Sequence, residues 1–313
     1  MQDPFDKRED AVYTTAVDVA PAVRRITCRN PSPYTFTGTQ TYLVGTRDLA
    51  LIDPGPDEPE HLRAILDAVG PGQRISHILV THSHRDHSPG AALLSGETGA
   101  DVYAYGAHGA GLSPTMESLV TSGADLGGGE GGDHSFQPKH LLADGDVVQG
   151  DDWRLGVLHT PGHLSNHISF SLDEAEAGTG TVFTGDTVMG FATTLVSPPD
   201  GDMAAFMDSL QLLSARSDDR LYLPGHGNPV SDPHGMLAYQ IAHREGRFDQ
   251  ILAALEDGPA TAGALARAIY TDVNPALLPA AARNVLASLI GLADQNRVVC
   301  QGPIAADARF ALP

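Results

Sequence analysis

The sequence predicts an α/β protein, with one large domain of alternating strands and helices followed by a small helical domain. Three observations lead to this prediction. The length of 313 residues exceeds the usual size of a single domain. Short β-branched runs alternate with helix-periodic segments, in two similar halves, over the part of the chain before Tyr239. From Tyr239 onward the sequence is rich in Ala and Leu, which favour helices. We therefore place the two domains at residues 1–238 and 239–313.

The first half of the large domain consists of apolar runs that turn residues interrupt. Strands are expected at 23–28, 41–44, 49–52 and 75–80. A helix is expected at 60–69, because apolar residues recur there at helical spacing. The strand at 75–80 runs directly into a histidine-rich segment, and Ser88-Pro89 is a suitable N-cap and first turn for the helix that follows. The histidines are therefore expected on a loop between a strand and a helix.

The second half and the tail continue the alternation. Strands are expected at 153–158, 167–171, 181–183 and 221–223, and a helix at 203–213. The tail ends in two short runs, 297–300 and 309–312, which suit the strands of a β wing. Between the halves, residues 106–140 form a Gly-rich segment that is longer than an ordinary connection, which is typical of functional or mobile loops. We expect this segment to cover a substrate site.

The composition indicates a globular protein. Hydrophobic residues make up 42% of the chain and charged residues 19%, and no segment approaches the roughly 18 unbroken apolar residues of a membrane helix. The amino terminus, MQDPFDKRED, lacks the basic flank and apolar run of a secretory signal. Two cysteines, Cys28 and Cys300, are too few for a disulfide scaffold. We expect a cytoplasmic protein that does not bind membranes.

The charge balance bears on the expected partners. Nineteen basic residues against 39 acidic ones give a formal net charge of −20, and such a surface repels polyanions. Nucleic acid is therefore a less favoured partner than a small-molecule substrate. Residues 240–313 carry six arginines and seven acidic residues, whereas a tail that bound nucleic acid on its own would be distinctly basic. We expect the tail to pack on the large domain or to form a homodimer.

The strongest chemical signal is the segment THSHRDH at 81–87, which places His82, His84, Asp86 and His87 within six positions. Imidazole nitrogens and carboxylate oxygens are the ligands that Zn²⁺ takes in catalytic sites. Alternation at 82 and 84 leaves these two side chains on one side of an extended segment. The pattern predicts a metal site, and the alternative is a polar surface loop in which the histidines have no common role.

Three further candidate ligands follow the same local pattern. His163, Asp186 and His226 each come after an apolar strand and a Gly-containing turn. Loops at the ends of strands are where a rigid sheet presents catalytic groups. The three side chains are therefore candidates to join the segment at 81–87.

The HxHxDH segment followed by these single positions resembles the metallo-β-lactamase superfamily over roughly residues 20–235. The resemblance implies an αββα sandwich, a four-layer arrangement of the mixed α and β type. GDTVMG at 185–190, PPDGDM at 198–203, and His243-Arg244 at the start of the tail resemble the branch that includes metallo-β-lactamase-like endoribonucleases and polyketide thioesterases. In that branch the C-terminal domain is a winged helix, which agrees with the tail expected here.

The resemblance also implies a set of metal ligands. One metal would be held by His82, His84 and His163, a second by Asp86, His87 and His226, and Asp186 would bridge the two. Two Zn²⁺ ions are expected, although such sites also accept Fe or Mn. Two neighbouring dications lower the pKa of a shared water towards neutrality and so provide a nucleophile. Asp86 and Asp186 are accordingly the predicted catalytic carboxylates.

Two residues are candidates to support the ligands. Asp53, at the end of its strand, resembles the carboxylate of the family that supports a ligand histidine, and the alternative is a turn-capping aspartate. His167 is either a donor or proton source behind the ligands, or a plain hydrogen-bonded histidine. Two histidines of the long loop, His134 and His140, are candidates to touch substrate. No other substrate-binding residue is assigned.

Three functions remain open at this point. The first is a hydrolase that cleaves an acyl bond, in a thioester, ester, lactone or amide, of a small molecule; the acidic surface favours it. The second is a single-strand endoribonuclease, for which the sequence offers only scattered arginines. These are Arg85, Arg154, Arg216, Arg220, Arg244 and Arg247. The third is a regulatory or interaction protein in which the metals only stabilise the fold.

Overall fold

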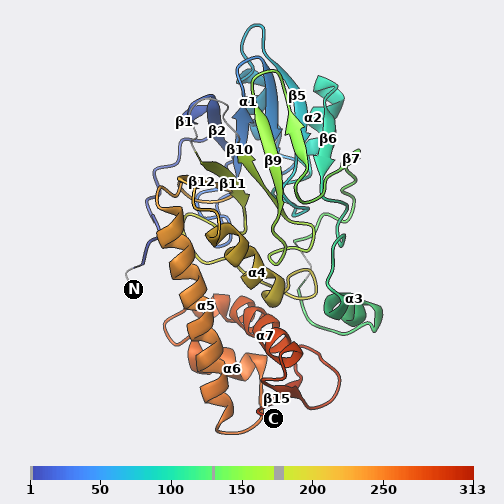
Figure 1. Cartoon of the computed structure of the whole chain (residues 1–313), viewed down its shortest axis with the longest axis vertical. Helices are drawn as coiled ribbons and strands as arrows, with labels where there is room; N and C mark the ends of the chain where they lie inside the picture. The colour runs from blue at the N-terminus through green and yellow to red at the C-terminus, as the bar shows by residue number, and fades with distance from the viewer. Residues whose placement is uncertain (1–2, 129–130, 173–179) are drawn as a thin grey trace.

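The large domain is a sandwich of two β-sheets with helices on both outer faces (Figure 1). The computed structural model describes residues 3–128, 131–172 and 180–313. The C-terminal helices lie at one end of the sandwich, beyond the second sheet and its helix α4 (Met203–Ser214). This arrangement confirms the four-layer αββα fold with a separate C-terminal domain.

The first sheet has the strand order β1-β2-β3-β4-β5-β6-β7, with antiparallel pairing up to β4 and parallel pairing beyond it. Its strands are β1 (Val17–Ala20), β2 (Val23–Thr27), β3 (Gln40–Val44), β4 (Asp48–Ile52), β5 (Arg74–Leu79), β6 (Asp101–Ala104) and β7 (His140–Leu141). Helices α1 (Pro59–Asp67) and α2 (Gly90–Thr98) make the parallel crossovers. The carboxyl ends of β4 and β5 consequently meet at one edge of the sheet.

The second sheet has the order β12-β11-β10-β9-β8. Its strands are β8 (Val147–Gln149), β9 (Arg154–His159), β10 (Ile168–Leu172), β11 (Thr181–Gly185) and β12 (Leu221–Pro224). The pair β11 and β12 is parallel, joined by a connection that contains α4, and the other pairs are antiparallel. The ends of β11 and β12 therefore present their next residues, Asp186 and the turn before His226, at the same edge.

Alternating side chains explain why the sheets stack. Along β4, Ala50 and Ile52 face the second sheet, where they join a core with Phe170 and Phe183. Leu49 and Leu51 point the other way and pack in the cluster that contains the buried residues of α1 and α2. A strand that is apolar on both faces is what a doubly covered sheet requires.

The C-terminal domain has its own core beneath a three-stranded sheet. Its helices are α6 (Ala262–Ile269) and α7 (Leu278–Asp294), the latter preceded by the short 3₁₀ helix Pro275–Leu277. Strands β13 (Ala260–Thr261), β15 (Arg309–Ala311) and β14 (Val299–Cys300) form the wing in that order. Helix α3 (Pro114–Thr121) of the Gly-rich segment packs into this core through Met116 and Leu119. The long segment is thus anchored on the C-terminal domain.

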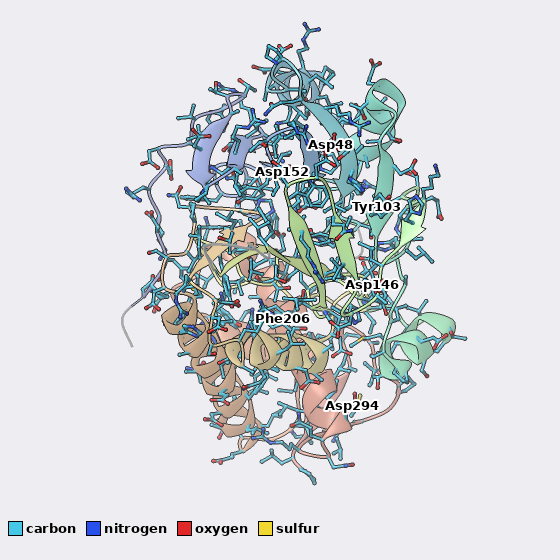
Figure 2. The ribbon with its side chains drawn as sticks, turned by 45° about the horizontal axis from the view of Figure 1, so that its top comes forward. Asp48, Tyr103, Asp146, Asp152, Phe206 and Asp294 are labelled. Atoms are coloured by element: carbon cyan, nitrogen blue, oxygen red, sulfur yellow. The ribbon has the colours of Figure 1, made fainter. Side chains whose placement is uncertain are left out.

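Helix α5 (Pro233–Leu255) belongs to both domains. Near its start Met236 and Leu237 pack with α4 and the second sheet, and near its end Ile251 and Leu255 pack in the C-terminal core. The predicted boundary between residues 238 and 239 falls inside this continuous helix. Phe206, which Figure 2 labels on α4, lies between the two domains and packs under the guanidinium of Arg244 from α5.

The expected strands and helices of both halves are present, with ends that differ by one or two residues. One local prediction is wrong. Ser88 does not cap α2, because the helix begins after Pro89 without a side-chain cap. The Ser88 hydroxyl lies 2.8 Å from Asp133 Oδ2 instead, and thereby ties the histidine loop to the Gly-rich segment. Tertiary contacts override the local capping signal here.

One described stretch, Pro275–Asp294, is long and apolar enough to cross a membrane by length and composition alone, with a mean hydropathy of 1.5. Of its most apolar window, 61% is buried inside the protein. Leu289 and Ile290 of α7 lie in the C-terminal core. Burial within the domain accounts for this hydropathy.

A buried histidine gives a testable pH dependence. His61 on α1 is 1% exposed, and its Nε2 donates to Thr41 Oγ1, which itself donates to Asp53 O. Its Nδ1 has no hydrogen-bond partner, so a proton added there would stay unpaired. Burial lowers the pKa of His61 from 6.5 to about 4.

His61 of the unfolded chain binds a proton near pH 6.5, whereas His61 of the folded protein stays neutral down to about pH 4. The neutral, buried His61 therefore makes its full contribution to the unfolding free energy above pH 6.5. It is lost as the pH falls towards 4. His61→Gln should therefore show a smaller loss of unfolding free energy between pH 7 and pH 4 than the unmodified protein, by about 3 kcal/mol. Urea unfolding of both proteins in the same metal state measures it, and parallel pH profiles would rule out this role.

Candidate metal centre

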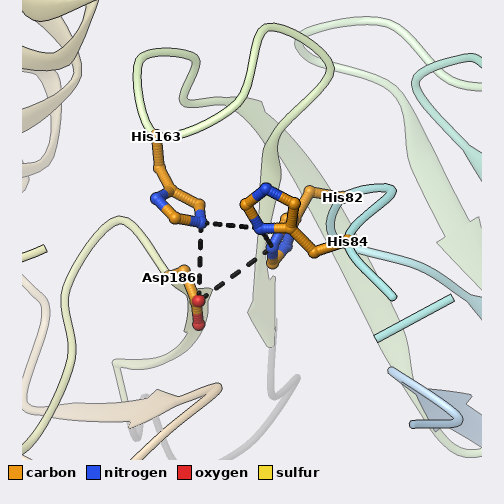
Figure 3. A group of neighbouring side chains, drawn as sticks. All are labelled: His82, His84, His163 and Asp186. Carbon is orange, nitrogen blue, oxygen red and sulfur yellow. Dashed lines mark hydrogen bonds and ion pairs between the residues drawn. The ribbon is translucent and has the colours of Figure 1, made fainter. Parts of the chain in front are cut away.

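Four candidate ligands converge at the end of the sandwich. Figure 3 shows the side chains of His82, His84, His163 and Asp186 pointing toward one another. Nδ1 of His84 lies 3.0 Å from Nε2 of His82 and 3.0 Å from Nε2 of His163. The nearest carboxylate oxygen of Asp186 is 3.5 Å from His163 Nε2 and 4.0 Å from His82 Nε2. One potential ligand atom from each residue thus lies within 4.8 Å of the others.

A second group adjoins the first. Asp86, His87 and His226 bring together one carboxylate oxygen and two Nε2 atoms. The two Nε2 atoms are 3.3 Å apart, and Asp86 Oδ2 lies 3.2 Å from that of His226 and 3.6 Å from that of His87. Asp186 reaches this group as well, with Oδ1 3.6 Å from His87 Nε2 and Oδ2 3.3 Å from His226 Nε2. All seven predicted ligands are therefore together, and Asp186 touches both groups.

Glycines allow the ligand loops to approach so closely. Gly185 has a φ of 47°, and a Cβ there would lie 2.5 Å from His167 Nε2. A Cβ on Gly225 would lie 2.4 Å from Asp186 Oδ1. A side chain at either position would displace the carboxylate or its support. The Gly-containing turns of the sequence are thus a geometric requirement of the site.

Two of the histidines have their remaining ring nitrogen held by the protein. Nδ1 of His163 donates to Leu195 O at 2.8 Å. Nδ1 of His82 donates to Thr81 Oγ1 at 2.9 Å, and that hydroxyl donates in turn to Asp53 Oδ2 at 2.8 Å. These bonds fix the tautomer, so the bare nitrogen faces the site.

Asp53 lies behind the ligands, as one of the two alternatives expected. Its Oδ2 accepts from His87 Nδ1 at 2.9 Å, and its Oδ1 accepts from the backbone N–H of Thr81 at 2.8 Å. The side chain is buried and bonds to the histidine loop rather than to its own turn. Asp53 therefore orients His87, and it also acts on His82 through the Thr81 hydroxyl.

His167 supports Asp186 but is not a donor to it. Its Nε2 accepts the backbone N–H of Asp186 at 3.0 Å, and its Nδ1 lies within 3.2 Å of the hydroxyls of Thr160 and Thr187. Burial lowers the pKa of His167 well below 6.5, so the ring is neutral. The proton of the neutral ring is then on Nδ1, which faces the two hydroxyls rather than the ligands, so the geometry favours a supporting histidine over a proton source.

The charges of the two groups differ. Burial lowers the pKa of His82 well below 6.5 and that of His84 to about 3. Burial also acts to lower the pKa of His226, but Asp186 and Asp86 raise it to about 9. Without a metal, a proton on His226 thus compensates the carboxylates. A bound cation would take the place of such a proton.

The residues present fit a divalent metal. The donor set consists of imidazole nitrogens and carboxylate oxygens, which Zn²⁺, Fe and Mn accept. Oδ1 of Asp186 is buried and has no hydrogen-bond partner, which is costly unless a cation binds it. His82, His84 and His163, together with Asp186, can hold one ion, and Asp86, His87 and His226 can hold another.

A cavity of about 510 Å³ opens onto both groups. His84, Asp86 and Asp186 lie on its wall, and apolar side chains such as Met189 and Phe191 line the rest. A small polar centre within a largely apolar cavity is typical of a small-molecule site.

The Gly-rich segment contributes part of the cavity wall, as expected, but not through its histidines. Gly128 and Gly131 line the cavity. His140 instead lies 2.9 Å from Asp101 Oδ2, and the ring of His134 packs edge-on against His108. Neither His134 nor His140 is among the described residues that line the cavity, so the structure lends no support to their contacting a substrate there.

Sequence reasoning missed the residues that shape the cavity. Asp200, whose Oδ1 is 3.4 Å from His108 Nε2, and Arg283 of α7 both line it. Arg283 comes from the other domain, so only the folded chain shows its place. The sequence did contain one signal for Arg283, which is the sole charged residue between Leu278 and Ala293 in an otherwise apolar helix.

The protein thus combines an αββα sandwich and a C-terminal wing with a candidate dinuclear metal site at the end of its sheets. Residues 34–226 match the family model described as the metallo-beta-lactamase superfamily. Residues 261–303 match the model of the beta-lactamase associated winged helix domain. The chain belongs to the metallo-beta-lactamase superfamily.

Relatives match most of the chain. A beta-lactamase-like protein 2 homolog from Drosophila melanogaster is 30% identical, over 85% of this chain and 88% of its own length. A protein named atrochrysone carboxyl ACP thioesterase, from Passalora fulva, is 30% identical over 76% of this chain and 62% of its own length. The crystal structure of a metallo-beta-lactamase family protein from Thermus thermophilus matches with a TM-score of 0.73 at 25% identity, covering 94% of this chain and 99% of that one.

Proposed function

We propose that the protein is a metal-dependent hydrolase that cleaves the acyl bond of a small-molecule thioester. The observation that carries the proposal is the carboxylate of Asp186, which touches both ligand groups at the wall of the cavity. When bound, a pair of divalent ions, Zn²⁺ or else Fe or Mn, supplies an activated water and polarises the acyl carbonyl.

The protein's own residues would orient this chemistry and shape the substrate site. Asp53 and Leu195 O fix the rings of His87 and His163, so that the ligand nitrogens face the cavity. The apolar walls at Met189 and Phe191 accommodate an acyl chain better than a polyanion. A relative named as a thioesterase supports this choice among acyl bonds.

The arginines that an endoribonuclease would need are not gathered at this cavity. Arg85 Nε donates to Gly132 O, Arg216 pairs with Asp219, and Arg244 is buried. None of the six scattered arginines is among the described residues that line the cavity. This placement favours the acyl substrate over a phosphate backbone.

The test compares two substrate classes in one experiment. Zinc-loaded protein is assayed on a small acyl thioester and on labelled single-stranded RNA at low salt. We expect thioester cleavage that a chelator abolishes and added zinc restores. Cleavage of RNA alone, rising as salt is lowered, would overturn the proposal in favour of the nuclease.

A variant separates catalysis from a structural role of the metal. His84→Ala removes the only ligand that offers Nδ1, and we expect cleavage of the thioester to be lost while the protein remains folded. Gly131 and the open cavity lie beside this ring, so little packing is lost. Thermal unfolding checks the fold. Unchanged turnover in folded His84→Ala would favour an interaction protein whose metals only stabilise it.

A further inference from the structure

The cavity contains one cation without a partner. Apart from the candidate metal ligands, the charged residues among its described lining are Asp200 and Arg283. Asp200 has a neighbour of its own, because its Oδ1 lies 3.4 Å from His108 Nε2. For Arg283, the described part of the chain offers neither an ion pair nor a hydrogen bond at Nε.

The position of Arg283 is fixed by its helix. The next residue, Asn284, accepts the backbone N–H of Val196 at 3.2 Å and Arg244 Nη1 at 3.1 Å. These bonds dock α7 against the 186–197 loop, which carries Asp186 and lines the cavity. The C-terminal domain thus holds the guanidinium of Arg283 at a fixed position in the wall of the cavity.

The backbone of Gly128 makes room for this side chain. A Cβ on Gly128 would lie 3.1 Å from Arg283 Cδ and 2.7 Å from Ser197 Oγ. Both Arg283 Nε and Ser197 Oγ are buried and have no hydrogen-bond partner. Two neighbouring polar groups that line one cavity therefore lack acceptors.

Such an arrangement is unfavourable for stability alone. Buried polar groups are nearly always hydrogen-bonded, and a half-buried arginine in an apolar helix is normally paired. An anionic ligand in the cavity would supply the missing charge and could accept two parallel bonds from the guanidinium.

We propose that Arg283 binds an anionic group of the substrate, a carboxylate or a phosphate, while the scissile acyl group lies at the metal centre. The inference rests on the proposed function, and it narrows the substrate class to thioesters that carry a negative charge. The charge belongs either to the acyl chain, as a carboxylate, or to the thiol leaving group, as a phosphate.

Two matched pairs of substrates distinguish the sources. Glutaryl and pentanoyl thioesters of N-acetylcysteamine differ in a carboxylate on the acyl chain, and butyryl thioesters of phosphopantetheine and pantetheine differ in a phosphate on the thiol. The readout is the ratio of kcat/KM for the charged and the neutral member. We expect the unmodified protein to prefer the charged member of one pair, and Arg283→Gln to lower that ratio by about tenfold or more.

Two further variants control the result. Arg283→Lys keeps the charge without the planar fork, and should retain part of the preference. Arg267→Gln removes an equal charge from an exposed position of α6 in the same domain, and should leave the ratio unchanged. Thermal unfolding verifies that all variants are folded. A ratio near one in the unmodified protein, or a ratio that Arg283→Gln leaves unaltered, would overturn the proposal.

A binding measurement makes the inference independent of turnover. The ketone analogues of the same four compounds, in which a methylene replaces the thioester sulfur, are titrated calorimetrically. Tight binding of a charged ketone that Arg283→Gln weakens about tenfold supports the anchor, even if no thioester is cleaved and the proposed function fails. Equal binding of charged and neutral ketones contradicts the anchor, even if thioesters are cleaved.

Discussion

Asp186→Asn is expected to abolish nearly all hydrolysis and to lower the metal content. The substitution keeps the size of the side chain but removes the charge that both ligand groups share. Burial opposes ionisation of Asp186, yet His226 and His87 hold its pKa well below 3.8, so the carboxylate is charged at neutral pH. An amide offers one neutral oxygen in place of two anionic ones.

The size of the effect follows from the metal chemistry. A loss of about 4 kcal/mol of transition-state stabilisation corresponds to a fall in kcat of roughly 10³-fold. Metal analysis after dialysis should find less than the full complement in Asp186→Asn. Asp200→Asn is the matched control, because it removes an acid from the same cavity outside both ligand groups and should retain the metal. Full metal content with normal turnover in Asp186→Asn would show that the carboxylate is not a shared ligand.

Much of this site was accessible from the sequence because its signals are local. THSHRDH follows a continuous apolar strand, and each later ligand follows a strand and a Gly-containing turn. Parallel strands end at a common edge, so β5, β11 and β12 bring His82, Asp186 and His226 together once the sheets stack. The family resemblance implied the two groups of ligands, and the observed strand order explains how the chain brings them together.

Other features depend on contacts that no local pattern encodes. Ser88 has the sequence of an N-cap, yet its hydroxyl bonds to Asp133, more than forty residues later. His134 and His140 lie in the segment that reaches the cavity, but that segment approaches through Gly128 and Gly131. Single residues of a long segment cannot be assigned to a surface before its path is known.

The same reason explains why the sequence did not reveal how the C-terminal domain contributes to the site. Its near-neutral charge made an autonomous nucleic-acid module less favoured, but nothing in its composition indicated that Arg244 and Asn284 would hold the 186–197 loop. Sequence patterns report which face of a helix is apolar, and they do not report which polar atom a buried cation will meet.

Arg244→Ala is accordingly the second substitution with a large expected effect. Arg244 is 2% exposed; it donates through Nη2 to Thr194 O and through Nη1 to Asn284 Oδ1, and it packs over the ring of Phe206. Burial lowers its pKa to about 10, which still leaves it charged at neutral pH. Alanine would leave a cavity and at least one unsatisfied carbonyl. We expect a loss of about 3–5 kcal/mol of unfolding free energy.

The effect should also reach the metal centre. Thr194, whose carbonyl Arg244 holds, donates from Oγ1 to Asp186 O at 2.6 Å. Under conditions where Arg244→Ala remains folded, kcat and metal content should therefore both fall, because the backbone that carries the shared ligand loses its support. Arg247→Ala, one turn further along α5, removes a cation that lies over the ring of Tyr270 and donates to Gln250 Oε1. We expect Arg247→Ala to lower the unfolding free energy by about 1 kcal/mol or less.

Arg244→Met distinguishes the two roles of Arg244, which fills space between the domains and holds the carbonyl of Thr194. Methionine fills most of the volume and removes a buried charge that has no acid partner among the described residues, so the unfolding free energy should recover much of what alanine loses. The bond to Thr194 O is not restored, and activity should remain low. Arg244→Met would thus recover unfolding free energy without recovering turnover. This result is expected if the C-terminal domain acts on the metal centre through the 186–197 loop. Recovery of full activity together with stability would instead show that Arg244 only fills space.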